Sequence, residues 1–245
     1  MIEAVKGISE QPITFDVNLQ DNIAKISYQN GLFSLPIDSA DEFPIAQEIS
    51  AGANVININS SVLAENINRS LFATGQDEIR PVMNGIFFDL SPESLSIVAT
   101  DGHKLVRNKI LNINNEVPAS FILPKKPANL LRSMLSKDGG DVTIKFDDRN
   151  AEINFGDGMI KCRLIEGRYP NYNSVIPQSN PNQLSVDRAA LLSALRRVQP
   201  FANGSSNLIR FHIENGILQL DAEDYDFSKT ATERMSCEYN GMPMS

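Results

Sequence analysis

Alternation of apolar and polar residues, rich in β-branched side chains, predicts short β-strands along most of the chain. Turn-forming residues separate the strands, as at Gln29-Asn30-Gly31 and Glu214-Asn215-Gly216. Because these connections are short, we expect mostly antiparallel sheet. The predicted strands cover 13–17, 23–28, 55–58, 85–90, 95–99, 120–123, 142–146, 151–155 and 160–164.

A helical period of apolar residues appears in three places, at 61–73, 127–137 and 187–199. Ser60 or Ser61 is placed to cap the first helix and Asp187 the third, whereas Pro127 suits the first turn of the second and Gly139-Gly140 its end. The expected apolar stripes are Leu63, Ile67 and Leu71, then Ala128, Leu131, Met134 and Leu135, then Leu191, Ala194, Leu195 and Val198. Few helices among many strands predict an α+β fold, with helices on one side of a sheet.

The pattern repeats at the spacing of a whole domain. Residues 55–73 match residues 184–202 at an offset of 129, since Leu184 falls on Val55. The match continues at an offset of 123, where Phe88 pairs with Phe211 and Asp101 with Asp224. Near the start of the chain, Thr14 aligns with Thr143 at an offset of 129. Chance likeness of strand-helix-strand stretches is the alternative, but three alignments with nearly constant offsets favour tandem domains.

The repeat divides the chain into three parts. Residues 1–48 correspond to the back half of a unit, 49–178 to a complete unit and 179–245 to the front half of a third. The extended, proline-punctuated stretches 36–49 and 170–181 join these parts and read most simply as linkers. We therefore expect a chain of three related domains of which the outer two are incomplete.

Composition indicates a soluble globular protein with 42% hydrophobic residues. No apolar run is long enough to span a bilayer, and the N-terminus lacks a secretory signal. Cys162 and Cys237 fall in different units, which favours reduced thiols in a cytoplasmic protein. The net charge of −8 argues at first against a nucleic-acid partner.

The distribution of basic residues changes that picture, because they gather on helices, off the apolar stripes. Such a set is often only a solvated face. Its recurrence in each repeat instead favours weak, base-independent binding of phosphates. The helical cations are Lys6, Arg69, Lys125, Lys126, Arg132, Lys137, Arg196 and Arg197.

Signatures of enzymes are missing from the sequence. Gly156-Asp157-Gly158 is a hairpin turn that no helix follows, so it is not a phosphate-binding loop. His103 and His212 lack the spacing of metal ligands, and we expect His212 to face solvent. Asp221, Glu223, Asp224 and Asp226 read either as a solvated strand end or as ligands of a divalent ion. We predict no catalytic residue, no cofactor and no resident metal.

Three motifs carry a family resemblance: Arg80-Pro81-Val82-Met83-Asn84-Gly85, then Val98-Ala99-Thr100-Asp101-Gly102-His103-Lys104-Leu105, then Leu164-Ile165-Glu166-Gly167-Arg168-Tyr169-Pro170-Asn171-Tyr172. They resemble the bacterial DNA polymerase III beta subunit, the replicative sliding clamp. The sequence of the chain looks most like the clamp of the Bacteroidetes group. The resemblance implies three similar domains per protomer and a head-to-tail homodimeric ring, with strands outside and helices around duplex DNA. It implies a processivity factor, not an enzyme, that tethers a polymerase through effective concentration.

The resemblance also implies site residues and partners. Lys6, Lys125 and Lys126 match positions that face DNA, and Arg132, Arg196 and Arg197 follow from helix geometry; Arg69 and Arg80 complete the predicted DNA-facing set. Polymerase and clamp-loader subunits would insert a short peptide into an apolar pocket, and no membrane partner is expected. The matching pocket positions are Met83, Thr100, Gly102, His103, Lys104, Leu105, Pro170, Val175 and Ile176, whereas Ser174 stands where many relatives carry arginine.

Two other classes of function stay open from the residues alone. One is an adaptor of repeated α+β modules that binds protein or polysaccharide and not DNA. The other is a metal-dependent enzyme built on Asp224 and Asp226. Because the outer units look incomplete, we also expect that the chain as it stands cannot close a ring.

Overall fold

The computed structural model describes residues 2–43, 45, 48–135 and 139–245. Packing of the backbone divides the chain into two compact units, 1–170 and 171–245. The predicted cation Lys137 lies outside the described residues, as does Pro44 in the first predicted linker. The three-part division of the chain stays a prediction, and each part is described by itself.

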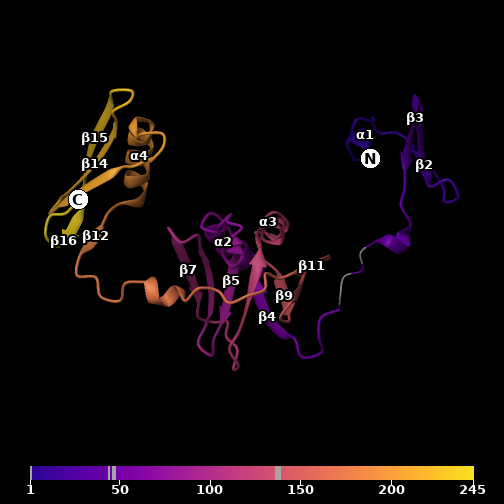
Figure 1. The fold of residues 1–245 in the computed structure, drawn as a ribbon, viewed down its shortest axis with the longest axis horizontal. Helices are drawn as coiled ribbons and strands as arrows, with labels where there is room; N and C mark the ends of the chain where they lie inside the picture. The colour runs from indigo at the N-terminus through magenta and orange to yellow at the C-terminus, as the bar shows by residue number, and fades with distance from the viewer. Residues whose placement is uncertain (1, 44, 46–47, 136–138) are drawn as a thin grey trace. The chain divides into compact units, whose positions relative to one another are not determined.

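The N-terminal part is a small sheet with a short helix (Figure 1). Helix α1 covers Ile2–Lys6. Strands β1 (Thr14–Asn18), β2 (Ile23–Tyr28) and β3 (Gly31–Pro36) form a three-stranded antiparallel sheet in that order. A 3-10 helix at Ala40–Glu42 follows. Only Ala24 and Ile26 of β2 are fully buried in this sheet.

The central part consists of two successive halves with the same order of elements, strand, helix and three strands. The first half contains β4 (Asn54–Asn59), α2 (Ser60–Leu71), β5 (Gly85–Leu90), β6 (Leu95–Thr100) and β7 (Leu105–Ile110), with a 3-10 helix at Pro81–Asn84. The second half contains β8 (Ala119–Pro124), α3 (Lys125–Met134), β9 (Asp141–Phe146), β10 (Asn150–Phe155) and β11 (Gly158–Arg163).

The two halves exchange their first strands. The sheets run β7-β6-β5-β8 and β11-β10-β9-β4, so β8 joins the sheet of the first half and β4 that of the second. All of these pairings are antiparallel. The exchange links both halves into one folding unit, because neither sheet is complete without a strand from the other half.

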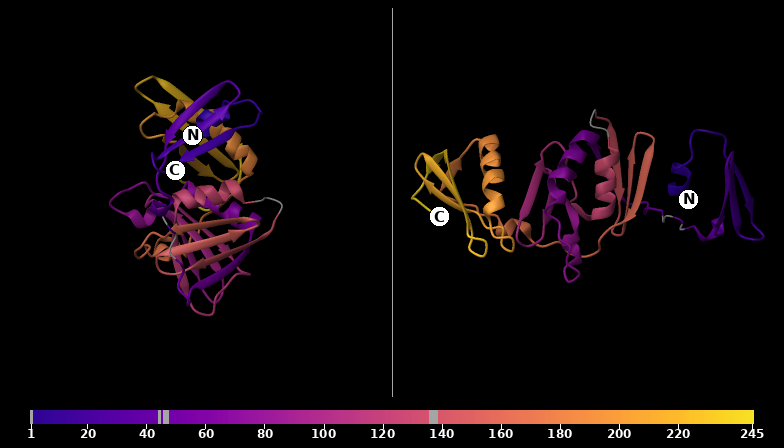
Figure 2. Two further views of the ribbon diagram at one scale, coloured as in Figure 1. Left: turned by 90° about the vertical axis from the view of Figure 1, so that its right-hand side faces the viewer. Right: turned by 90° about the horizontal axis from the view of Figure 1, so that it is seen from above.

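Helices α2 and α3 pack against each other and cover the same side of the two sheets (Figures 1 and 2). Leu63, Ile67 and Leu71 of α2 and Leu131 of α3 are buried against the inward residues of the strands. Phe88, Phe121 and Phe146 form a stacked and tilted aromatic series in this core, with successive ring centroids 4.6 and 4.4 Å apart. The opposite helix faces stay exposed, which leaves their cations available.

The second unit repeats the order of one half of the central part. A 3-10 helix at Tyr172–Val175 precedes β12 (Gln183–Ser185), α4 (Arg188–Val198), a 3-10 helix at Gln199–Phe201, β13 (Arg210–Glu214), β14 (Ile217–Asp224), β15 (Lys229–Ser236) and β16 (Glu238–Asn240). The sheets run β13-β14-β15 and β12-β16, and Met244 forms a bridge with Ile213. Its core gathers Ala194 and Val198 with Leu218 and Leu220.

The α+β fold class with antiparallel sheets is confirmed. Two local predictions are wrong. The cap of α2 is Asn59, whose side chain accepts a hydrogen bond from the Ser61 N–H, and not Ser60 or Ser61. Met134 is 53% exposed because α3 ends at this residue and turns it out of the stripe. The Asp187 cap of α4 is confirmed, because its side chain accepts a 2.7 Å hydrogen bond from the Ala190 N–H.

Within the described residues, no helix is long and apolar enough to cross a membrane.

Candidate functional site

The exposed face of α3 carries two cations without a carboxylate partner in the described part of the chain, Lys126 and Arg132. Lys125, half-buried beside them, donates from Nζ to the Gly75 carbonyl at 3.1 Å. The first turn of α3 contains no acidic residue, and its cap position, Pro124, supplies no side-chain acceptor. The positive charge of the lysines and the N–H groups at the start of α3 therefore both attract negative charge.

A hollow of about 720 Å³ lies between the end of α2 and α3. Lys104, Lys125 and Arg132 line it, and the amides of Asn68 and Asn129 add further hydrogen-bonding groups. The carboxylate in the lining, Asp101, is paired with the Lys104 ammonium. A surface with this excess of cationic and amide donors suits the oxygen atoms of phosphates.

Three of the predicted DNA-facing cations are bound to neighbouring carboxylates. Arg69 pairs with Glu65 one helical turn away, and Arg80 Nε lies 3.0 Å from Asp77. Arg197 donates two hydrogen bonds to the Glu233 carboxylate of β15, and the one from Nε is 3.0 Å long. The Arg197 hydrogen bonds lower the pKa of Glu233. These arginines contribute little net charge to a surface, because each is offset by its partner.

The remaining predicted cations, Lys6 and Arg196, are exposed at the ends of α1 and α4. Neither has a carboxylate partner among the described residues. The strongest candidates for phosphate contact are thus Lys126 and Arg132, which share one helix, with Lys6 and Arg196 on others.

The predicted peptide pocket includes a tight turn between β6 and β7. The Asp101 carboxylate accepts the Lys104 side chain and the N–H groups of Lys104 and His103, at 2.9 and 3.0 Å for the N–H groups. These contacts, the Lys104 ammonium first, hold the pKa of Asp101 well below its usual range. Thr100 Oγ1 closes the turn by donating to the Lys104 carbonyl and accepting the Gly102 N–H. Gly102 has φ of +90°, a conformation that favours glycine.

Tyr169 fixes this turn to the segment that follows β11. Its hydroxyl oxygen accepts the Thr100 N–H at 3.0 Å, and its ring stacks on Phe87 with centroids 4.5 Å apart. Burial raises the pKa of Tyr169 to about 12, with the Thr100 N–H acting in the opposite direction. Pro170, a predicted pocket residue, directly follows Tyr169 and is therefore positioned in the chain by this contact.

The structure brings some of the predicted pocket residues together in the first unit and places others in the second unit. Thr100, Gly102, His103, Lys104 and Leu105 belong to one turn. Met83 is half-buried and accepts the Gly75 N–H at its carbonyl. Val175 and Ile176 lie in the second unit, at the end of its first 3-10 helix. Their role in a pocket stays a prediction.

Sequence reasoning gave no role to Tyr169 or Asp77. Asp77 orders the loop before β5, because it accepts the Ile79 N–H and pairs with Arg80. The backbone bond from Ile79, and then Arg80, lower the pKa of Asp77. Its spacing of three residues from Arg80 was a readable signal. Tyr169 lies in the third motif, but its contact with Thr100 was not readable because Thr100 lies 69 residues away.

The His212 side chain is 38% exposed, in line with the prediction that it faces solvent, but it also has two polar neighbours. Its Nε2 lies 3.2 Å from Asp221 Oδ2, and its Nδ1 lies 2.7 Å from the Ser245 hydroxyl. Asp224 of the acidic set is buried and accepts hydrogen bonds from Asn203 Nδ2 and the Asp226 N–H. Among the described residues, no group of three acidic, cysteine or histidine side chains is arranged to hold a metal ion.

Comparisons with known proteins match both units. The family described as DNA polymerase III beta subunit, central domain, matches residues 57–171, and that described as DNA polymerase III beta subunit, C-terminal domain, matches residues 173–245. The beta sliding clamp of Synechococcus elongatus is 30% identical over 97% of this chain, and that of Pseudomonas aeruginosa 26% identical over 94%. The chain spans 65% and 62% of the lengths of these two relatives.

Solved structures give the same result. A DNA polymerase III subunit beta from Pseudomonas aeruginosa superposes on 99% of this chain with a TM-score of 0.86 and 26% identity, using 66% of its own chain. A sliding clamp from Bartonella birtlesii, solved bound to griselimycin, also gives a TM-score of 0.86, 26% identity and the same two coverages.

Proposed function

The chain belongs to the DNA polymerase III beta subunit family, and on this premise we propose that it works as a DNA sliding clamp. In this role the ring of the complete protein encircles duplex DNA, holds it without reading bases, and tethers a polymerase so that successive nucleotides are added without release. The two consecutive domain matches, in one order and over 57–171 and 173–245, carry the proposal.

The surface chemistry of the central part supports contact with duplex DNA. Lys126 and Arg132 extend from one exposed helix face, beside a hollow lined by further cations and amides. Contacts of this kind bind phosphates and carry no sequence information. Few unpaired cations on an otherwise acidic chain make the binding weak, which suits a protein that must slide.

The partner site in this proposal is the pocket around the Thr100–Leu105 turn. A short linear peptide from a polymerase or clamp-loader subunit would bind at the predicted positions of the first unit, which are Met83, Thr100, Gly102, His103, Lys104, Leu105 and Pro170. The rigid turn supports this assignment, because Asp101 and Tyr169 hold its backbone before a partner arrives. The protein acts as an accessory factor in the cytoplasm, with no reaction of its own, and the complete protein forms a head-to-tail homodimer.

Fluorescence anisotropy with labelled duplex DNA tests the DNA-binding part of this proposal. Two duplexes of unrelated sequence should bind with equal affinity, and that affinity should fall steeply as salt rises. No detectable binding at low salt would favour the rival adaptor, and strong preference for one duplex would contradict a sliding function.

A further inference from the structure

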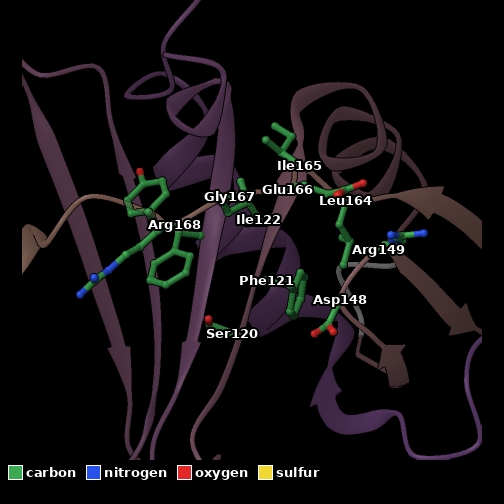
Figure 3. Close-up of a pocket in the computed structure, with 12 residues that line it drawn as sticks. Ser120, Phe121, Ile122, Asp148, Arg149, Leu164, Ile165, Glu166, Gly167 and Arg168 are labelled. Carbon is green, nitrogen blue, oxygen red and sulfur yellow. The ribbon is translucent and has the colours of Figure 1, made fainter.

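The central part contains a groove along β8. It opens into a hollow of about 610 Å³ whose lining comes only from residues 87–169. Figure 3 shows the segment from Leu164 to Arg168 crossing β8 near Ile122, with Ser120 and Asp148 facing the space beside the crossing. Phe121, Ile122 and Leu164 give this hollow an apolar part.

One wall of the groove is an open sheet edge. Strand β8 is the last strand of its sheet and pairs only with β5. The Ile122 carbonyl points away from β5, since it accepts the Ile165 N–H at 3.0 Å. Because backbone groups alternate in direction along an antiparallel strand, the N–H and C=O of Ser120 point the same way. Within the described residues nothing binds them, so they are available to an added strand.

The groove continues into a second hollow of about 350 Å³ that shares Ser120 and Asp148 with the first. Asp89, Asp147 and Asp148 line it, and none of its lining residues is basic. Asp147 accepts the N–H groups of Arg149, Asn150 and Ser50, and these bonds, Arg149 first, lower its pKa. The Asp148 carboxylate is exposed and has no partner in the described part of the chain. The negative charge of this hollow suits a Lys or Arg side chain.

We propose that the groove along β8 binds an extended peptide segment of a partner protein by strand addition, with a basic side chain of the peptide in the hollow lined by Asp147 and Asp148. Main-chain bonds to Ser120 give such a complex its affinity, and the acidic hollow selects the side chain. The proposed contacts, at Ser120 and Asp148, involve neither the turn at Thr100 nor the cations of α3, although Phe87 and Tyr169 line the far part of the first hollow. The proposal can therefore be tested separately from the proposed clamp function.

Titration of the whole chain with a fluorescein-labelled pentapeptide, acetyl-Val-Thr-Arg-Val-Thr-amide, tests the proposal by fluorescence anisotropy. We expect saturable binding below about 1 mM. The same peptide methylated on the arginine backbone nitrogen, or with glutamate in place of arginine, should bind about tenfold more weakly. Absence of binding, or equal binding of all three peptides, overturns the proposal.

Two variants locate the contact. Ser120→Pro removes the outward N–H without breaking a bond to β5, and Asp148→Asn removes the unpaired charge. Each should weaken peptide binding about tenfold, while Asp157→Asn, on the exposed β10–β11 turn, should not. Asp148→Asn keeps the test valid if Ser120→Pro lowers the melting temperature. Unchanged binding in Asp148→Asn, or a dimer in solution that this variant dissolves, contradicts a peptide partner. Duplex DNA binding should be the same in all variants.

Discussion

At the scale of single residues, Tyr169 makes the most consequential contact outside the core. Its hydroxyl is the acceptor of a buried N–H, and both Tyr169 and Thr100 are less than a tenth exposed. Tyr169→Phe leaves that N–H without an acceptor and should lower the free energy of unfolding by about 1–3 kcal/mol. Urea denaturation measures the change. Tyr225→Phe, at an exposed tyrosine, is the control and should differ little from the unchanged protein. Equal stability of both variants would show that the contact is dispensable.

Cys162 gives a prediction about pH. Burial raises the pKa of its thiol to about 11, so little thiolate exists in the folded protein at pH 8. The sign follows from desolvation, which disfavours the charged form of an acid. Alkylation of Cys162 by iodoacetamide at pH 8, followed by mass spectrometry, should be much slower in the folded protein than in urea, and should accelerate as pH approaches 11. Equal rates in both states would refute the shift.

Some residue-level features were readable from the sequence and others were not. Arg69 and Arg80 have acidic residues four and three positions earlier, so their ion pairs follow from local spacing. The pairing of Arg197 with Glu233 was not readable, because these residues lie 36 positions apart and meet only when α4 packs near β15. For this reason, counting cations by helix face overstated the free positive charge.

At the scale of elements, the cap of α2 offers a direct test. Asn59 Oδ1 accepts the Ser61 N–H at 3.0 Å and also the Ser61 hydroxyl. Asn59→Ala should therefore destabilise the protein by about 1 kcal/mol. Thermal or urea denaturation measures this. Asn129→Ala, on the exposed face of α3, should be neutral or slightly stabilising because alanine is the better helix former. A neutral Asn59→Ala would mean that the cap contributes nothing.

The sequence predicted the regular elements better than their partners. Strands such as Gly85–Leu90 and Ile23–Tyr28 were predicted with the correct bounds, because apolar and β-branched residues concentrate there. Strand β7 was missed, since polar residues at Arg107, Asn108 and Lys109 obscure its alternation at a sheet edge. The exchange of β4 and β8 between sheets was also beyond reach, because it depends on pairings that periodicity does not encode.

At the scale of the whole molecule, the net charge of −8 conceals an uneven distribution. On the helix face of the central part, Lys126 and Arg132 have no carboxylate partner in the described residues. On the sheet face, exposed Lys145 and Arg163 lie among acidic residues, with Arg163 within 3.9 Å of Glu166. A partner with regularly spaced negative charge should therefore favour the helix face.

The central claim is that duplex DNA binds to the helix face, and a matched pair of charge reversals tests it most directly. Duplex affinity is measured across a salt series for the unchanged protein, Lys126→Glu/Arg132→Glu and Lys145→Glu/Arg163→Glu, which change net charge equally. We predict that the helix-face variant loses affinity. The slope of log affinity against log salt concentration should also become shallower by about 2, as expected for two lost phosphate contacts. The sheet-face variant should keep most of its affinity. Equal losses in the two variants, or a larger loss on the sheet face, would contradict the account.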